Sequence, residues 1–212
     1  MSALHNCNRT PLQIIAFIFA GLLLFTFNSC GGNSQYDKDV KDFRAMKNES
    51  FTNTTSSPLS KKELIDFKGL SYFEVDQTYK LQAKFIAAAI PKYISLFESD
   101  DVKQIHVVRG NLHFKINNTN CSLLAYSSAG QALHSLFIPF LDTHKNSYPG
   151  GRYVDAKLIN DSTCTLDFNL SYNPYCVYNE KYKCAIVPES NRLEIEIPAG
   201  ERWKQINKSD PQ

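Results

Sequence analysis

The chain has 212 residues, a formal net charge of +2 at pH 7 and a hydrophobic fraction of 43%. Its lysines and arginines are scattered and its net charge is small, which argues against a protein that binds nucleic acid through a basic surface. The length fits one ordinary globular domain plus a leader, and it is sufficient to bury a proper core.

The only strongly apolar stretch of the chain covers residues 14–27. It is too short to cross a bilayer comfortably as a helix and follows a weakly basic segment, so it predicts a signal peptide over residues 1–29. Cys30 comes next, with Ser29 before it and two glycines after it, an arrangement that resembles a bacterial lipoprotein processing site. We therefore expect lipidation of Cys30 and anchoring to a membrane of the cell envelope, facing the periplasm or the exterior. The alternatives are a plain signal peptide cut nearby and a retained membrane anchor.

Two short helices are expected near the start of the exported part. Tyr36, Val40 and Phe43 recur at helical spacing, which predicts an amphipathic helix over residues 36–47. Ser60 and Glu63 have the spacing of a capping box, which predicts a second helix start.

The rest of the chain alternates apolar and polar residues, as strands do. The clearest case is Leu112, Phe114 and Ile116, which precede the turn residues 117–120. We predict a mainly β fold, a β-sandwich or partly open barrel with one or two short N-terminal helices; an α+β fold is the alternative. Strands are expected at residues 79–85, 106–116, 122–127, 136–141, 152–158, 163–170 and 193–197. The predicted divisions are a signal peptide (1–29), an anchor, spacer and short helix (30–56), a β-rich globular domain (57–205) and a C-terminal tail (206–212).

Four cysteines follow Cys30, an even number that in an exported chain suggests disulfides. Cys176 and Cys184 are eight positions apart and are the clearest candidate pair, and Cys121 and Cys164 are the other candidates. Free buried thiols are one alternative and a metal site is the other, although no Cys or His spacing supports a metal.

Several segments together resemble the bacterial domain-of-unknown-function family numbered 1684, over roughly residues 57–203. The most specific are Gly-Gly-Arg-Tyr at residues 150–153 and Asp-Phe-Asn followed by Tyr-Asn-Pro-Tyr-Cys between residues 167 and 176. The resemblance implies a small, largely uncharacterised domain and names no reaction. It also implies that members without export leaders carry equivalents of Cys176 and Cys184, which weighs against a disulfide between these two.

Polar and aromatic residues concentrate between residues 142 and 192. If the strands at 152–158 and 163–170 pair, Tyr153, Asp155 and Asp167 share one face and line a pocket with residues 148–151 at its mouth. In the alternative, Arg152 pairs with nearby acids in a purely structural network. The candidate ligand-binding residues are Tyr148, Gly150, Gly151, Arg152, Tyr153, Asp155, Asp167, Asn169, Tyr172, Asn173 and Arg192.

These features favour an envelope module that binds a small polar ligand or another envelope component. One alternative is a hydrolase-like enzyme that uses Arg152 with Asp142, Asp155 and Asp167. The other is a protein–protein interaction module with an exposed patch of tyrosines. No catalytic, metal-ligand or cofactor motif is present, so we assign no catalytic residue and expect no metal, cofactor or nucleic-acid partner. The tyrosines of the interaction hypothesis are Tyr172, Tyr175, Tyr178 and Tyr182.

Overall fold

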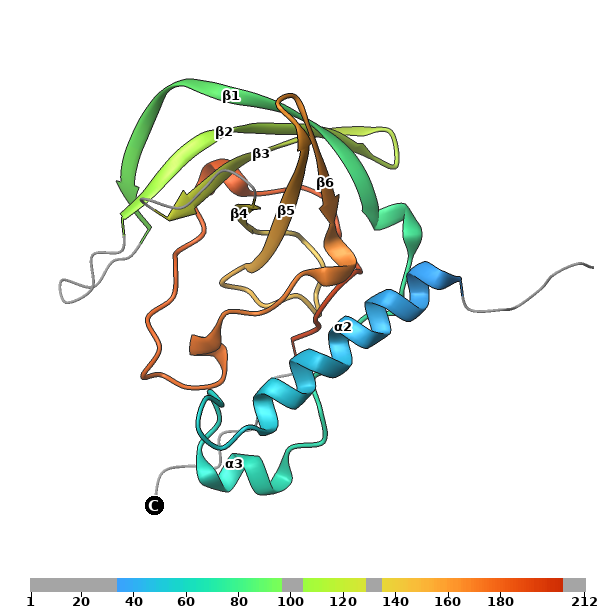
Figure 1. Ribbon diagram of the computed structural model, residues 1–212, viewed down its shortest axis with the longest axis vertical. Helices are drawn as coiled ribbons and strands as arrows, with labels where there is room; N and C mark the ends of the chain where they lie inside the picture. The colour runs from blue at the N-terminus through green and yellow to red at the C-terminus, as the bar shows by residue number, and fades with distance from the viewer. Residues whose placement is uncertain (1–33, 97–104, 129–134, 204–212) are drawn as a thin grey trace, which may run out of the picture. The chain divides into compact units, whose positions relative to one another are not determined.

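The computed structural model describes residues 34–96, 105–128 and 135–203. The predicted signal peptide, Cys30 and the predicted C-terminal tail lie outside the described residues. Six antiparallel strands pair with their sequence neighbours, and the last pairs back with the first to close a barrel (Figure 1). The predicted mainly β fold is confirmed, with a closed barrel where the sequence suggested a sandwich or a partly open one. The strands are β1 (Lys80–Ser95), β2 (Ile105–Ile116), β3 (Thr119–Ser128), β4 (Ser135–Phe140), β5 (Arg152–Asn160) and β6 (Thr163–Asp167).

The alternation along each strand determines which side chains fill the barrel. On β2, Leu112, Phe114 and Ile116 are buried while His113 and Lys115 are exposed, as a strand with one buried face requires. The neighbouring strands add a matching inward row, so the core is continuous around the barrel. That row includes Ala83, Phe85, Leu123, Ala125, Leu136, Ile138, Val154, Ala156, Cys164 and Leu166.

The connection between β2 and β3 confirms the turn predicted from sequence. Asn117 and Asn118 have φ angles of 48° and 66°, the left-handed conformation that a two-residue hairpin turn needs at both positions. Asparagine tolerates this conformation better than most residues, so these two residues set the register of the hairpin.

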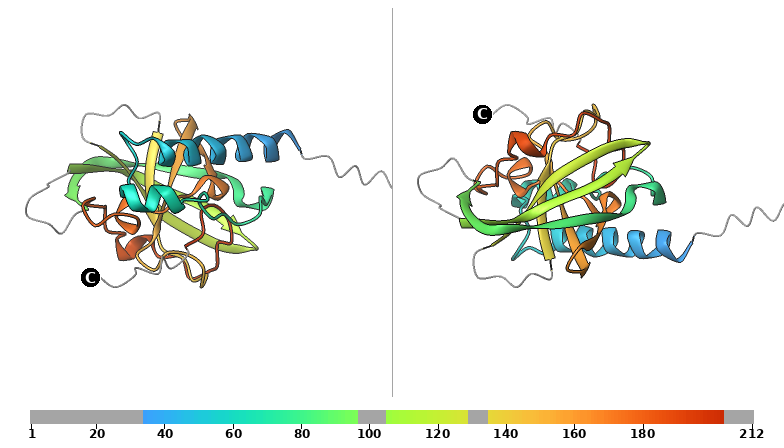
Figure 2. Two further views of the ribbon diagram at one scale, coloured as in Figure 1. Left: turned by 90° about the horizontal axis from the view of Figure 1, so that it is seen from below. Right: turned by 90° about the horizontal axis from the view of Figure 1, so that it is seen from above.

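Two helices lie at one end of the barrel, α2 (Gln35–Thr52) and α3 (Lys61–Asp66) (Figures 1 and 2). The helix predicted over residues 36–47 is confirmed but continues to Thr52, because its last turn buries Phe51 against Phe67 and Tyr178. The capping box is confirmed. Ser60 Oγ accepts from the Glu63 amide at 3.3 Å, and the Ser60 amide donates to the Glu63 carboxylate at 2.8 Å.

Three strand predictions were wrong. The strand predicted at 79–85 continues to Ser95 as β1, and the other two errors lie at 163–170 and 193–197. β6 ends at Asp167, because its carboxylate accepts from the Asn169 amide at 3.0 Å and starts a 3-10 helix, η3 (Phe168–Leu170). The segment 193–197 forms no strand. Its apolar residues fill the end of the barrel, and its backbone bonds to the segment that follows β4. The other 3-10 helices are η2 (Gln77–Tyr79), η4 (Tyr175–Val177) and η5 (Glu189–Asn191).

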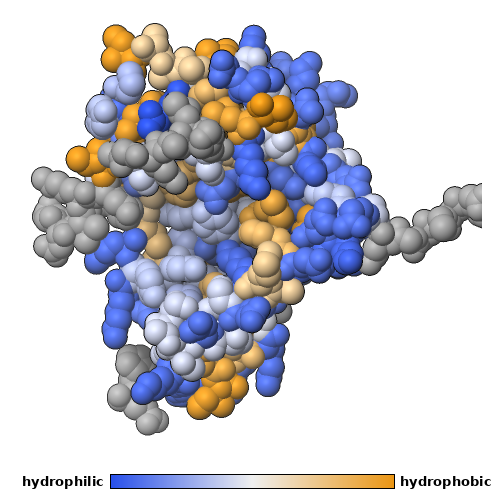
Figure 3. All heavy atoms as spheres, viewed as in Figure 1, coloured by the Kyte–Doolittle hydropathy of each residue, from blue (hydrophilic) through white to orange (hydrophobic). Residues whose placement is uncertain are grey.

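The surface is mostly hydrophilic along α2, and hydrophobic residues gather on the part of the barrel farthest from the helices (Figure 3). Exposed apolar side chains there include Ile86, Ile90, Tyr93 and Ile105 of β1 and β2. Among the described residues, no helix is both long and apolar enough to cross a membrane.

Candidate functional site

Arg152, the most prominent of the predicted ligand-binding residues, is completely buried inside the protein. Its Nη2 atom lies 2.8 Å from the Asp142 carboxylate, whose side chain is 1% exposed. The guanidinium also donates to the carbonyls of Ile197, Ala199 and Glu201 at 2.5–3.2 Å. Arg152 therefore holds the C-terminal segment against the barrel and is not available to a ligand.

Asp167 and Asn169 are also occupied by internal contacts. The Asp167 carboxylate accepts from Tyr36 of α2 at 2.9 Å. The Asn169 side chain forms two hydrogen bonds, of 2.7 and 3.0 Å, with the backbone of Asp76. These contacts attach α2 and the segment before β1 to the end of β6.

Asp155 lies on the outer face of β5, as does Tyr153, but the two have different surroundings. Tyr172 donates to the Asp155 carboxylate at 3.1 Å, whereas the buried Tyr153 donates to the carbonyl of Ala185. Burial raises the pKa of Asp155 above its ordinary value, and the hydrogen bond from Tyr172 opposes only part of this rise. The structure thus brings Asp155 to Tyr172 and gives Asp167 another partner, so the two carboxylates share no common partner of the kind that the hydrolase hypothesis invoked.

Gly151 is buried, Tyr148 is half-buried and Arg192 is exposed, and the three have unrelated surroundings. Gly151 has a φ of +93°, and a Cβ there would lie 2.4 Å from a methyl of Val187, so this glycine allows close packing. Tyr148 lies against Gly150 and Trp203. Arg192 is exposed and pairs with Glu189 at 2.5 Å.

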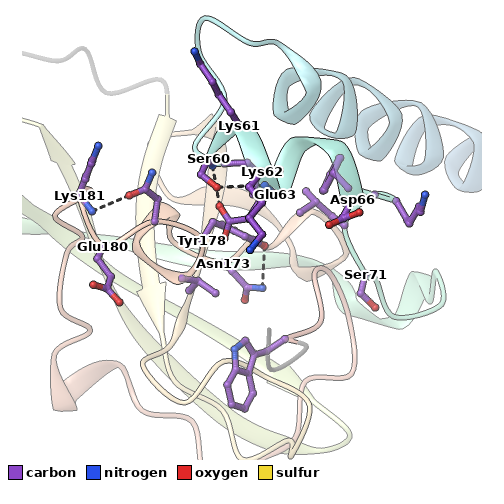
Figure 4. A pocket seen from close by; sticks show the side chains of 18 of the residues that line it. Ser60, Lys61, Lys62, Glu63, Asp66, Ser71, Asn173, Tyr178, Glu180 and Lys181 are labelled. Carbon is purple, nitrogen blue, oxygen red and sulfur yellow. Dashed lines mark hydrogen bonds between the residues drawn. The ribbon is translucent and has the colours of Figure 1, made fainter. Parts of the chain in front are cut away.

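A hollow among the described residues lies elsewhere, at the end of the barrel near α3 (Figure 4). It has a volume of about 1260 Å³. Its walls come from α3 and the residues on either side of it, from Asn173 and residues 177–181, and from Arg202 and Trp203. Of the predicted ligand-binding residues, Asn173 alone contributes to this lining.

A buried carboxylate, that of Glu201, lies behind the lining and organises it. Its side chain is fully buried and pairs with Lys47 of α2 at 3.1 Å. The Tyr178 hydroxyl donates to the same carboxylate, and so do the backbone amide and the side-chain amide of Asn173, at 3.3 and 3.0 Å. Burial raises the pKa of Glu201 and lowers that of Lys47, and each charge opposes the shift of the other.

This arrangement fixes the orientation of the Asn173 amide. Because a carboxylate only accepts hydrogen bonds, the Nδ2 group of Asn173 must face Glu201, which leaves Oδ1 directed elsewhere. Asn173 is 1% exposed, and its buried Oδ1 atom has no hydrogen-bond partner among the described residues. A buried amide oxygen without a donor costs free energy, and Asn173 is one of the residues that line the hollow.

The pocket carries both signs of charge and an apolar lining. Lysine and arginine side chains lie around it together with three carboxylates, and Leu59, Phe67, Val177 and Trp203 supply apolar surface. Figure 4 shows Asn173 and Tyr178 together, with Ser60 and Glu63 of the capping box nearby. The charged lining residues are Lys61, Lys62, Glu63, Asp66, Lys68, Glu180, Lys181 and Arg202.

The four described cysteines are free thiols in two different settings. Cys121 and Cys164 are buried in the barrel core, where burial raises the pKa of both thiols. Cys176 and Cys184 are half-buried neighbours beside the pocket, and the amide of Cys176 donates to the Cys184 sulfur at 3.1 Å. No cluster of three or more potential metal-ligating side chains occurs within the described part of the chain.

A comparison with protein families matches residues 65–202 to DUF1684, described as a protein of unknown function. The match covers more than half of the chain. The chain belongs to the DUF1684 family. The solution NMR structure of an uncharacterised protein of Haloarcula marismortui is similar to this DUF1684 protein, with 34% identity and a TM-score of 0.65. The comparison covers 80% of this chain and 95% of the archaeal one. A search of curated proteins gives no match.

The family match begins after α2, yet α2 supplies three side chains to the polar interior of this DUF1684 protein. Tyr36 donates to Asp167, and Lys47 pairs with Glu201. Arg44 donates to the backbone carbonyls of Phe73 and Asn169. Neither Glu201 nor Lys47 was predicted from the sequence to have a role. The only local signal was a glutamate between a glycine and an arginine near the end of the domain, which does not reveal its burial.

Proposed function

We propose that this domain is a binding module that holds a small polar ligand in the pocket beside α3. One observation carries the proposal: Asn173 lines the pocket, its amide is oriented by Glu201, and its buried oxygen has no partner among the described residues. A rigid acceptor of this kind, in an otherwise partly apolar hollow, is a typical feature of a specific ligand site.

The lining indicates which ligand chemistry fits. The Asn173 oxygen needs an O–H or N–H donor, and the apolar walls need a carbon-rich face. Because the charges around the pocket are mixed, they favour a neutral or zwitterionic molecule over a polyanion. A saccharide, with many hydroxyls and an apolar ring face, meets all three requirements.

Thermal stabilisation by a panel of neutral and amino sugars tests this proposal. A ligand at one hundred times its Kd stabilises a protein by about 2.7 kcal/mol, which is a shift of several degrees for a domain of this size. Val177→Trp fills the pocket and is expected to abolish the shift, while Lys38→Ala on the exposed face of α2 leaves it unchanged. The proposal fails if no sugar stabilises the protein, or if Val177→Trp responds like the unaltered chain.

We further propose that the module is tethered to an envelope membrane by a lipid on Cys30. The support is the apolar segment 14–27, followed after Asn28 by Ser29, Cys30 and two glycines. Metabolic labelling with an alkyne fatty acid in a bacterial host is expected to label the chain and not its Cys30→Ala variant. Equal labelling of both chains, or of neither, contradicts the tether.

A further inference from the structure

Cys176 and Cys184 are the two thiols of the described chain that lie next to each other. The Cys176 amide reaches the Cys184 sulfur at 3.1 Å, so the chain folds back on itself between them. Both residues are half-buried, which leaves them within reach of a small reagent. The two ends of this loop are also held together by the rings of Tyr175 and Tyr182, whose centroids are 5.3 Å apart.

The surroundings give the two sulfurs different reactivity. A hydrogen bond from the Cys176 thiol lowers the pKa of Cys184 to about 7, and the same contact raises the pKa of Cys176. Since the thiolate is the reactive form, Cys184 is suited to be the attacking sulfur and Cys176 the one that resolves the product. Cys164 differs, because burial in the barrel core raises its pKa to about 11.

The loop between these two cysteines forms one wall of the pocket. Residues 177–181 all line it, and Tyr178 among them donates to the buried Glu201. A covalent bond between Cys176 and Cys184 would close this loop at its base and reduce the motion of the wall.

We propose that Cys176 and Cys184 form a reversible disulfide that fixes this wall of the pocket and so regulates ligand binding. The regulatory part rests on the proposed function, whereas the bond itself does not.

The oxidant is a small-molecule or protein disulfide. The Cys184 thiolate attacks one of its sulfurs, its S–S bond breaks, and one thiolate leaves. Cys176 then loses its proton to solvent and attacks the Cys184 sulfur, which releases the second thiolate. Two cysteine thiols are oxidised by two electrons, one external disulfide is reduced to two thiols, and a dithiol reverses the sequence.

Peptide mapping of the full-length chain tests the bond. The folded protein is treated with oxidised glutathione, alkylated, digested with trypsin and analysed by mass spectrometry. The expected product joins the peptide of residues 158–181 to that of residues 184–192, and Cys176→Ser removes it. Cys164 lies in the first peptide, so Cys164→Ala serves as the matched control and must retain the product. Absence of the linked peptides, or their persistence in Cys176→Ser, overturns the proposal.

Amide hydrogen exchange of residues 177–181 tests the regulation. Oxidation is expected to slow their exchange at least several-fold and to raise the melting temperature by several degrees, with neither change in Cys176→Ser. Unchanged exchange in a protein that has formed the bond overturns the regulatory claim. If the bond forms and slows exchange but no sugar stabilises either redox state, the proposed function fails while the redox site stands.

Discussion

Replacing Arg152 by methionine is expected to destabilise the domain more than any exposed substitution. The change removes an ion pair with Asp142 and three hydrogen bonds to carbonyls of the C-terminal segment, all in the interior. It also leaves the Asp142 carboxylate buried without its cation. Breaking a buried pair in this way costs about 3–5 kcal/mol. For a domain of this size that loss corresponds to a fall of roughly 6–20 °C in Tm.

Urea unfolding followed by tryptophan fluorescence measures this effect. The chain has a single tryptophan, Trp203, whose amide donates to the carbonyl of Asn146 at 2.8 Å, so the probe reports on the segment that Arg152 holds. The double variant Asp142→Leu with Arg152→Met should recover part of the loss, because it leaves no unpaired charge. The exposed Arg192→Met should leave the urea midpoint unchanged. A loss below about 1 kcal/mol for Arg152→Met refutes a structural role for Arg152.

Three further substitutions are expected to change the stability of the domain. Burial raises the pKa of Glu201 above its ordinary 4.5, so the folded state holds that proton more tightly and its stability falls as pH rises from 4.5 through the folded pKa. Glu201→Gln should flatten this part of the profile of urea midpoint against pH; an unaltered slope would show that the carboxylate does not titrate there. Gly200→Ala should cost about 2 kcal/mol or more by urea unfolding, because φ is +79° and the new Cβ would lie 2.5 Å from the Phe168 carbonyl. Gly150→Ala, which meets only the Tyr148 ring, should cost clearly less, and equal losses would contradict the steric reason. Ser60→Ala should cost about 1 kcal/mol by removing the cap of α3, and a neutral result in urea unfolding would show that this cap contributes nothing.

The features that sequence predicted well are those set by near neighbours along the chain. The period of two at Leu112, Phe114 and Ile116, the positive φ angles of Asn117 and Asn118, and the capping box each depend on residues a few positions apart. Such patterns can be recognised in a sequence because the backbone conformation itself constrains the residue type. The closure of the barrel could not be predicted in this way, because it depends on the pairing of β1 with β6, which are far apart along the chain.

The candidate site was harder to predict from the sequence, because its residues come together only in the tertiary fold. Arg152 looks like a ligand-binding residue in its glycine-rich segment, but its partners are carbonyls 45–49 positions away. Glu201 and Lys47 are 154 positions apart, and neither sits in a recognisable motif. Asn173 was among the predicted residues, yet its pocket partner Tyr178 was considered only as part of an aromatic surface patch.

The pairing of Lys47 with Glu201 determines how this domain must be cut for experiments. A fragment that begins where the family match begins, at residue 65, lacks the cation that compensates the buried carboxylate and the tyrosine that caps Asp167. Its interior would then contain an unpaired charge, and its failure to fold would say nothing about the barrel itself. Side chains from both ends of the described chain pair with each other, so the smallest unit that keeps these pairs starts at Gln35, the first residue of α2.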